Sequence, residues 1–411
     1  MNGAVKKLEV RLTRSLGNER PVGTLVESGG RVYFEYDAAF LQQPLWLSPF
    51  KLPPRPGLLE HRDRSFGPLP GLFDDSLPDG WGLLLMDRYF RQQGRRPEEM
   101  TALDRLAYLG SRTMGTLTYH PPTDPDSAPQ ALDLGVLAEA AAAVLRGNAA
   151  EVLPQLLRAG GSPGGARPKV LVGVRGDELL SGEAELPADF EAWIVKFPAH
   201  QDDRDAGALE ETYARMARRA GIHLPPTRLF ATADGGSYFG VRRFDRQAGR
   251  RFHVHSFGNL IHADFRLPSC DYQQLLELTQ ALTRRRQDLL EQFRRAVFNV
   301  LAHNRDDHAK NFSFRFDDHD KWEISPAFDL VFAPGPGGEH TTTVAGEGKA
   351  PGRRHLFELA EKAGIEAGQA REICEEVAAA VSGFTAIASE LGVAWQRVRD
   401  IAAAIDRCLC A

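Results

Sequence analysis

Polar residues that could carry out phosphoryl transfer lie close together in one part of the chain. Residues 303–311 read His-Asn-Arg-Asp-Asp-His-Ala-Lys-Asn, and residues 325–329 read Ser-Pro-Ala-Phe-Asp. Asp306 would accept or orient the proton of an attacking hydroxyl group, and Asn311 and Asp329 would hold Mg²⁺ against the phosphates of a nucleotide. This spacing therefore predicts a phosphoryl-transfer site and indicates a kinase.

A predicted hairpin would position two of these side chains. Apolar and polar residues alternate at 311–316 and again at 322–324, with the turn Asp317-Asp318-His319-Asp320 between them. Because the two ends of a hairpin meet, Asn311 and Asp329 could face one shared ion, and we interpret the acidic turn as solvated. The alternative is that the polar residues of this site only cap helices and form turns.

A glycine-rich segment upstream resembles a loop that covers a nucleotide. Residues 160–169 read Gly-Gly-Ser-Pro-Gly-Gly-Ala-Arg-Pro-Lys and lead into the apolar run at 170–174, which predicts a loop followed by a strand. The segment is not a Walker A loop, because Gly165 is followed by Ala166 and not by lysine and serine or threonine. By itself the segment could also be a plain connector.

A lysine within an apolar strand and a glutamate on the next helix form a further candidate pair. Lys196 interrupts the apolar run at 193–197, and a buried ammonium needs a partner, although the lysine could instead protect an edge strand. The helical pattern at 209–220 supplies Glu210, which we choose over Glu211. The order of glycine-rich loop, strand lysine, helix glutamate, aspartate, asparagine and second aspartate is that of a kinase's two lobes.

The remaining pattern predicts three regions along the chain. Strand-like runs at 8–12, 23–26 and 31–36 indicate a β-rich region over residues 1–125, in which Ser76 and Asp79 are candidate N-caps for a helix at 83–90. The Pro- and Ser-rich stretch at 121–128 marks a boundary. Further predicted elements are helices at 132–157, a hairpin turn at 234–236, and mostly helices from 275 to the end. We predict regions at 1–125, 126–255 and 256–411.

Composition and charge narrow the class of protein. The 411 residues allow two or three domains, and 43% hydrophobic and 26% charged residues are typical of a soluble globular protein. The net charge of −5 argues against direct binding of nucleic acid or of a membrane surface. We interpret the arginine clusters at 284–286 and 294–295 as a solvated helix face.

Cysteine usage and hydropathy indicate the compartment. The four cysteines have no CxxC spacing, so free thiols in a reducing cytosol are expected. No apolar window approaches the length of a membrane span, and the first ten residues lack the apolar core of a signal peptide. We therefore expect a cytoplasmic protein.

Several motifs resemble the HipA family of serine/threonine kinases, the toxins of bacterial HipBA toxin-antitoxin modules. The resemblance spans nearly the whole chain, and the DxHAKN motif that contains Asp306 and Asn311 is specific. The other motifs are Ser325-Pro326-Ala327-Phe328-Asp329-Leu330, Arg243-Phe244-Asp245-Arg246, His253-Val254-His255-Ser256, Trp193-Ile194-Val195-Lys196-Phe197, Leu47-Ser48-Pro49-Phe50 and the segment from Phe73 to Gly82.

The resemblance implies a fold and a set of site residues. The fold would be α+β, with a bilobal protein-kinase-like core, a preceding β-rich subdomain and a helical carboxy-terminal lobe. The cofactors would be ATP and Mg²⁺. Asp306 would be the catalytic aspartate, and the implied metal ligands are Asn311 and Asp329. The implied nucleotide-binding residues are Gly164, Gly165, Lys169, Lys196, Glu210, and the adenine hinge Arg242 to Phe244, where Arg242 stands in place of an acidic residue.

The resemblance also implies regulation and partners. Ser162 matches the loop serine that family members autophosphorylate, and an added charge of about −2 in a loop that cradles phosphates gives a physical reason for switching the enzyme off. A HipB-like DNA-binding antitoxin would be the partner. The substrate would be a protein, which in relatives is often a translation factor such as an aminoacyl-tRNA synthetase.

Two alternatives from other classes remain at this point. The first is a kinase-like fold that has become a regulatory or partner-binding scaffold. The second is a metallohydrolase with His303, Asp306 and His308 as ligands, which lacks the HExxH spacing of such enzymes.

Overall fold

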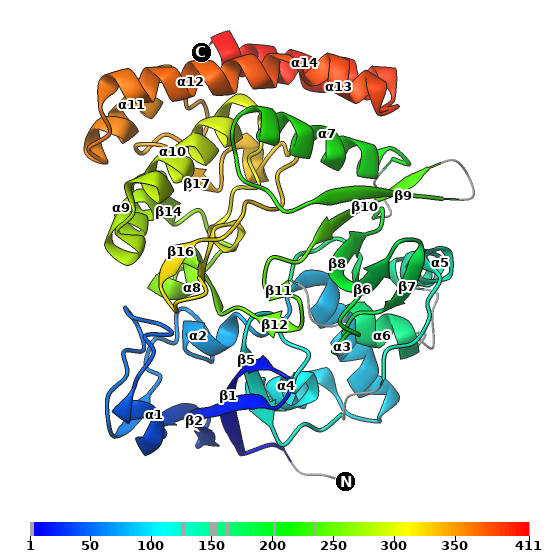
Figure 1. The fold of residues 1–411 in the computed structure, drawn as a ribbon, viewed down its shortest axis with the longest axis vertical. Coiled ribbons are helices and arrows are strands. Elements are labelled where there is room, and N and C mark those ends of the chain that lie inside the picture. The colour runs from blue at the N-terminus through cyan, green and yellow to red at the C-terminus, as the bar shows by residue number, and fades with distance from the viewer. Residues whose placement is uncertain are drawn as a thin grey trace. The chain divides into compact units, whose positions relative to one another are not determined.

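The computed structural model describes residues 4–124, 128–147, 154–160, 164–183, 185–199, 203–232 and 236–410. The chain divides into two compact units. The first unit comprises Met1–Asp202, Thr232–His255 and Asn259–His262, and the second comprises Asp203–Ala231, Ser256–Gly258 and Ala263–Ala411. Figure 1 shows that the chain contains both strands and helices, and the predicted α+β class is confirmed. The three sequence regions proposed above stay a prediction.

The first unit begins with an antiparallel sheet in the order β4-β3-β2-β1-β5. In the first strand Leu8, Val10 and Leu12 are buried, as expected when every second side chain faces the core. The predicted strand at 31–36 is confirmed with the same bounds. The strands are β1 (Lys7–Ser15), β2 (Asn18–Ser28), β3 (Arg31–Tyr36), β4 (Leu58–Glu60) and β5 (Leu117–His120).

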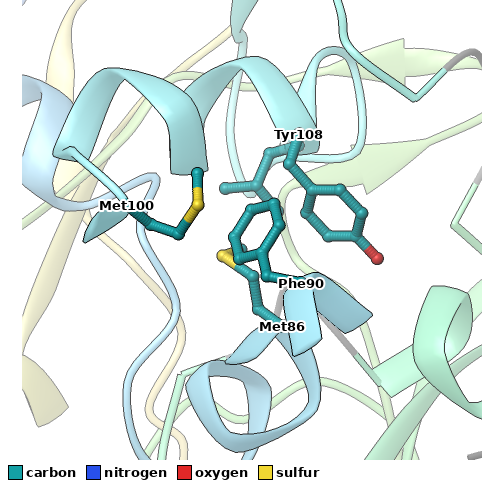
Figure 2. Close-up of a cluster of buried hydrophobic side chains, with 5 residues drawn as sticks. Met86, Phe90, Met100 and Tyr108 are labelled. Atoms are coloured by element: carbon teal, nitrogen blue, oxygen red, sulfur yellow. The ribbon is translucent and has the colours of Figure 1, made fainter. Parts of the chain in front are cut away.

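Two of the short helices that accompany this sheet, α3 (Gly80–Gln92) and α4 (Ala102–Leu109), share an apolar cluster. Figure 2 shows Met86 and Phe90 of α3 packed with Met100 and with Tyr108 of α4, and Leu109 completes the cluster. Burying these side chains against one another contributes the main stabilisation of such helices, which are marginal on their own. The helices are α1 (Ala38–Gln42), α2 (Gly71–Asp74), α3 (Gly80–Gln92), the 3₁₀ turn η1 (Pro97–Glu99) and α4 (Ala102–Leu109).

A second antiparallel sheet in the first unit runs in the order β7-β6-β8-β10. The strand that carries Lys196 lies between two others, so the edge-strand interpretation of this lysine is wrong. Sheet order depends on long-range pairing, which a local pattern does not reveal. The elements of this part are α5 (Leu134–Leu145), α6 (Pro154–Gly160), β6 (Lys169–Arg175), β7 (Glu178–Ser181), β8 (Glu191–Lys196), β10 (Ser237–Arg242), β11 (Arg246–Gln247) and β12 (Arg250–Arg251). The predicted turn at 234–236 lies largely outside the described residues.

The second unit is mostly helical. Tyr213, Phe298 and Phe384 are fully buried in its core, and the Tyr213 hydroxyl donates to the Ala302 carbonyl at 2.8 Å. Its elements are α7 (Ala206–Arg219), β9 (Thr227–Ala231), β14 (Cys270–Asp271), α9 (Tyr272–Thr283), α10 (Arg286–Leu301), η2 (Ala309–Asn311), β15 (Ser313–Phe316), β16 (Trp322–Ile324), η3 (Pro336–Gly338), β17 (Thr342–Thr343), α11 (Arg353–Lys362), α12 (Ala367–Ser382), α13 (Phe384–Glu390) and α14 (Trp395–Cys410). Strand β13 (Val254–Ser256) and helix α8 (Phe257–Ile261) lie where the chain passes between the units.

The arginines at 284–286 do not form a purely solvated face. Arg285 makes ion pairs with Asp317 at 2.7 Å and with Glu323 at 3.0 Å. Asp317 of the turn between β15 and β16 is therefore paired with the residue before α10, which corrects the interpretation of Arg285. Asp318 and His319 of the same turn are exposed, as predicted. Within the described part of the chain, no helix is both long enough and apolar enough to cross a membrane.

A buried histidine of the first unit predicts acid sensitivity. Burial lowers the pKa of His253 to about 3, while its Nε2 lies 2.9 Å from the Leu47 carbonyl oxygen. Below about pH 6.5 the unfolded chain binds a proton that the folded chain rejects, so stability falls as the pH drops, by about 2 kcal/mol at pH 5. Burial also lowers the pKa values of His262 and His303 to about 4, which adds to the effect in the same direction.

Urea unfolding at pH 7.5 and at pH 5.0 checks this prediction. The loss of unfolding free energy between the two pH values should be smaller by about 2 kcal/mol in His253→Gln than in the wild type. His319→Gln, in the exposed turn after β15, is the control and should keep the wild-type loss. Equal losses in all three proteins would contradict the prediction.

Candidate active site

The loop that carries Asp306 begins where α10 ends. The backbone of His303 adopts a left-handed conformation with φ of 55°, which ends the helix, and the Asn304 N–H donates to the Asn299 carbonyl at 2.9 Å. Residues 305–308 are irregular, and η2 follows. Asp306 is exposed in this loop, as a residue that must meet an incoming substrate requires.

Asn311 lies at the end of η2, and not in the strand that the sequence pattern predicted. Its Nδ2 donates to the Asp306 carbonyl oxygen at 2.7 Å. Because the amide nitrogen is used in this way, the amide oxygen is the end of the side chain that suits a cation. The contact also ties the candidate metal ligand to the backbone of the candidate catalytic residue.

Asp329 follows the hairpin of β15 and β16, whose predicted antiparallel pairing is confirmed. The Ser325 N–H donates to the Ser313 carbonyl at 2.9 Å, so the two ends of the hairpin meet as expected. Asp329 has a φ of 58°, a left-handed conformation that costs a non-glycine residue about 1 kcal/mol or more. Such conformations concentrate at functional sites. That Asn311 and Asp329 share one ion stays a prediction.

Asp307 is a residue of this loop that the sequence analysis missed. It is only 1% exposed, and its carboxylate accepts hydrogen bonds from the Tyr272 hydroxyl at 2.8 Å, His340 Nδ1 at 2.8 Å and the Thr341 N–H at 2.9 Å. These partners lie more than thirty positions away in the sequence. The only sign of Asp307 in the local sequence was that it directly follows Asp306.

Two lysines of the first unit lie opposite each other on neighbouring strands. Lys169 of β6 pairs with Lys196 of β8 in the sheet register, and they are 5% and 9% exposed. Lys169 Nζ donates to the Gly164 carbonyl at 2.6 Å, and Lys196 Nζ lies 5.7 Å from the centre of the Phe239 ring. Like charges opposite each other destabilise a sheet, so this arrangement suits an anion that binds both.

The end of the glycine-rich loop is held by the start of α3. The Gly165 N–H donates to the Asp79 carboxylate, and the Trp81 N–H donates to the Gly165 carbonyl at 3.0 Å. Gly80 has a φ of 42°, and a Cβ there would lie 2.6 Å from the Cα of Ala166. Asp79 precedes α3 as predicted, but its side chain does not cap the helix. Ser162 lies outside the described residues.

The segment predicted to hold adenine contains a buried ion cluster. Arg242 is partly exposed and pairs with Glu191 at 2.7 Å, whereas Phe244 is half-buried. The carboxylate of Asp245 is buried and accepts two hydrogen bonds from Arg243, at 2.9 and 2.8 Å, and one from Arg246 at 2.6 Å. This cluster gives the RFDR motif a structural role, and the adenine contacts stay a prediction.

Glu210 lies in α7 of the second unit and is 5% exposed. The neighbouring Glu211 is committed to other partners within that unit, Arg215 at 3.0 Å and the Thr227 hydroxyl at 2.6 Å. The choice of Glu210 over Glu211 and the ion pair of Glu210 with Lys196 stay predictions.

The geometry does not favour a histidine-ligated hydrolase. His303 stacks on Phe332 with ring centres 5.2 Å apart, and its Nδ1 lies 3.4 Å from Cys408 Sγ. Over the stretches of chain that the structure describes, no group of three or more histidine, cysteine or acidic side chains is arranged to hold a metal ion.

Fold and site together define a kinase-like α+β protein, and comparisons with known proteins give its family. Residues 161–384 match the HipA-like C-terminal domain, and residues 15–120 match the HipA N-terminal domain. The chain therefore belongs to the HipA family.

Two relatives show how far the similarity extends. The chain is 26% identical over 334 residues to a protein of Sinorhizobium fredii described as the putative kinase Y4dM, covering 76% of this chain and 74% of the relative. The fold of this chain is similar to that of HipA of Shewanella oneidensis MR-1, which was solved in complex with HipB and operator DNA. The TM-score is 0.71 at 16% identity, with 98% of this chain and 96% of the other covered. At this identity the second likeness shows the fold alone.

Proposed function

We propose that this protein is an ATP- and Mg²⁺-dependent protein serine/threonine kinase of the HipA type. The observation that carries the proposal is the arrangement around Asp306. This carboxylate is exposed in a loop whose backbone is bound by the amide of Asn311, and Asp329 follows the adjoining hairpin in a left-handed conformation. These are the residue types and the order that phosphoryl transfer requires.

In the proposed reaction a serine or threonine hydroxyl oxygen attacks the γ-phosphorus of ATP in line with the bond that breaks. Asp306 orients this hydroxyl and takes its proton, and ADP leaves with the bridging oxygen. Asn311 and Asp329 would hold Mg²⁺, which when bound neutralises charge on the phosphate oxygens. Most of the rate gain would come from positioning and charge neutralisation.

The proposed role of the two lysines is to bind the phosphates, and it makes a prediction about Lys196→Met. Losing one charge-assisted contact of about 1.5–3 kcal/mol should weaken Mg·ATP binding about 10- to 100-fold. Calorimetric titration measures the dissociation constant of Mg·ATP, and thermal unfolding without nucleotide shows whether the variant is folded.

A matched control for this prediction is Lys362→Met, which removes an exposed lysine that pairs with Glu358 at 2.9 Å. This variant should bind Mg·ATP as the wild type does. Wild-type affinity in Lys196→Met would contradict the proposed phosphate site.

Incubation with γ-labelled ATP and Mg²⁺ tests the proposed function itself. We expect label on the protein, with Ser162 as the proposed autophosphorylation site, and none when Mg²⁺ is chelated. Binding of ATP with no transfer to the chain or to any protein of a cell extract would indicate the alternative, a kinase-like scaffold.

We further propose that the protein is the toxin of a toxin-antitoxin module in the cytoplasm. Support comes from the family and from the Shewanella protein, which was solved with HipB and operator DNA. The partner would be a HipB-like DNA-binding antitoxin, and the net charge of −5 suits a chain that leaves DNA contacts to that partner. The substrate would be a protein, with a translation factor or an aminoacyl-tRNA synthetase as the leading class. Growth arrest on expression, relieved by the adjacent antitoxin, tests this assignment.

A further inference from the structure

The buried carboxylate of Asp307 joins the loop of Asp306 to a distant segment of the second unit. His340 Nδ1 and the Thr341 N–H donate to it at 2.8 and 2.9 Å, and the Thr342 N–H lies 3.3 Å away. Its side chain has no exposed surface. A buried carboxylate with this many donors is strongly fixed, because removing it would leave several buried donors without a partner.

The same segment holds the backbone on both sides of Asp306. The Thr341 hydroxyl donates to the Arg305 carbonyl at 3.1 Å, and the Thr342 hydroxyl donates to the Asp307 carbonyl at 2.5 Å. The Thr341 N–H also lies 3.2 Å from the Arg305 carbonyl. The peptide groups before and after the catalytic residue are thus anchored, while its own side chain stays exposed.

A second set of contacts anchors Asp307 to the helices. The Tyr272 hydroxyl donates to the Asp307 carboxylate at 2.8 Å and accepts from Asn299 Nδ2 at 2.8 Å. Asn304 Nδ2 in turn donates to Asn299 Oδ1 at 2.9 Å. The network therefore links the start of α9, the end of α10 and the loop of Asp306.

The segment 340–342 lies within residues 330–349, which follow the candidate metal ligand Asp329. At this place in the chain many protein kinases carry an activation segment, which phosphorylation orders through new ion pairs. In this chain the carboxylate of Asp307 supplies the negative charge without modification. The side chains of Thr341 and Thr342 are buried, and their hydroxyl groups already donate to backbone carbonyls. Phosphate on either threonine would break these contacts.

We propose that Asp307 is a positioning residue that holds Asp306 in its working geometry through the 340–342 segment, so that this segment needs no phosphorylation for activity. The inference rests on the proposed kinase function. It assigns to Asp307 a role in transfer and not in nucleotide binding.

Kinetics of Asp307→Asn test the inference, because asparagine keeps the shape and removes the charge. We expect kcat to fall about 10- to 100-fold, with the Mg·ATP dissociation constant within twofold of wild type and one nucleotide still bound per chain. Binding at full stoichiometry separates misplacement of Asp306 from a loss of folded protein. Tyr272→Phe, which removes one donor to Asp307, should show a smaller fall. Asp318→Asn, in the exposed turn after β15, is the control and should keep the wild-type kcat.

Two further measurements complete the test. Amide hydrogen exchange of Thr341 and Thr342 should be at least tenfold faster in Asp307→Asn, and phosphatase treatment should not lower the initial rate of the wild type. Wild-type kcat in Asp307→Asn, or activity that requires phosphate on Thr341 or Thr342, would overturn this inference and leave the proposed function intact. A wild-type protein that binds ATP without transferring phosphate would overturn the proposed function and this inference together.

Discussion

Replacing Asp306 by asparagine should reduce phosphoryl transfer about 10³-fold and leave the dissociation constant of Mg·ATP close to that of the wild type. The carboxylate is exposed in its loop, so it can reach a substrate hydroxyl, and an amide cannot take the proton. The nucleotide would be held by other groups, which is why affinity should persist. Initial rates with γ-labelled ATP and a titration with a non-hydrolysable analogue measure the two quantities.

The control for this prediction is Glu358→Gln, which alters a glutamate of α11 whose side chain is 44% exposed and pairs with Lys362 at 2.9 Å. We expect this variant to transfer phosphate at close to the wild-type rate. Transfer by Asp306→Asn at the same rate as this control would remove Asp306 from the mechanism.

Replacing Asp245 by alanine should destabilise the protein by about 3–5 kcal/mol. Burial alone would raise the pKa of Asp245, but the guanidinium groups of Arg243 and Arg246 and the Gly115 N–H hold it below its usual range. Without the carboxylate, two arginines of the first unit remain in the protein interior with no matching charge. The urea midpoint of unfolding at pH 7.5 measures the effect.

An exposed ion pair of the same unit provides the comparison. Asp189 pairs with Arg175, and the side chains are 55% and 46% exposed, so Asp189→Ala should change the unfolding free energy by less than about 1 kcal/mol. Equal changes in unfolding free energy for Asp245→Ala and Asp189→Ala would contradict the prediction that the buried cluster stabilises the protein more than an exposed ion pair does.

Local patterns in the sequence predicted much of the local structure. The period of two in residues 31–36 fixed a strand with the observed bounds, and the two alternating runs around Asp317 formed the expected hairpin. The DxHAKN motif placed Asp306 and Asn311 next to each other, and the contact between Asn311 Nδ2 and the Asp306 carbonyl agrees with that spacing. These features depend on neighbours in the sequence.

Features that depend on residues far apart in the sequence could not be predicted from local patterns. Lys196 lies in a central strand because of which strands pair, and Asp79 binds Gly165 across 86 positions in the sequence. Asp307 finds its partners 33 to 35 positions away, and a second acidic residue in a loop gave no sign of its burial. The ion pair between Lys196 and Glu210, which was inferred from the order of the motifs, likewise stays a prediction.

A crystal structure with Mg²⁺ and a non-hydrolysable ATP analogue is the most direct test of the account. It predicts an ion about 2.0–2.1 Å from the amide oxygen of Asn311 and from the carboxylate of Asp329, in contact with the phosphates, with Asp306 facing the γ-phosphoryl group. A nucleotide bound elsewhere, or an ion that neither side chain contacts, would contradict it.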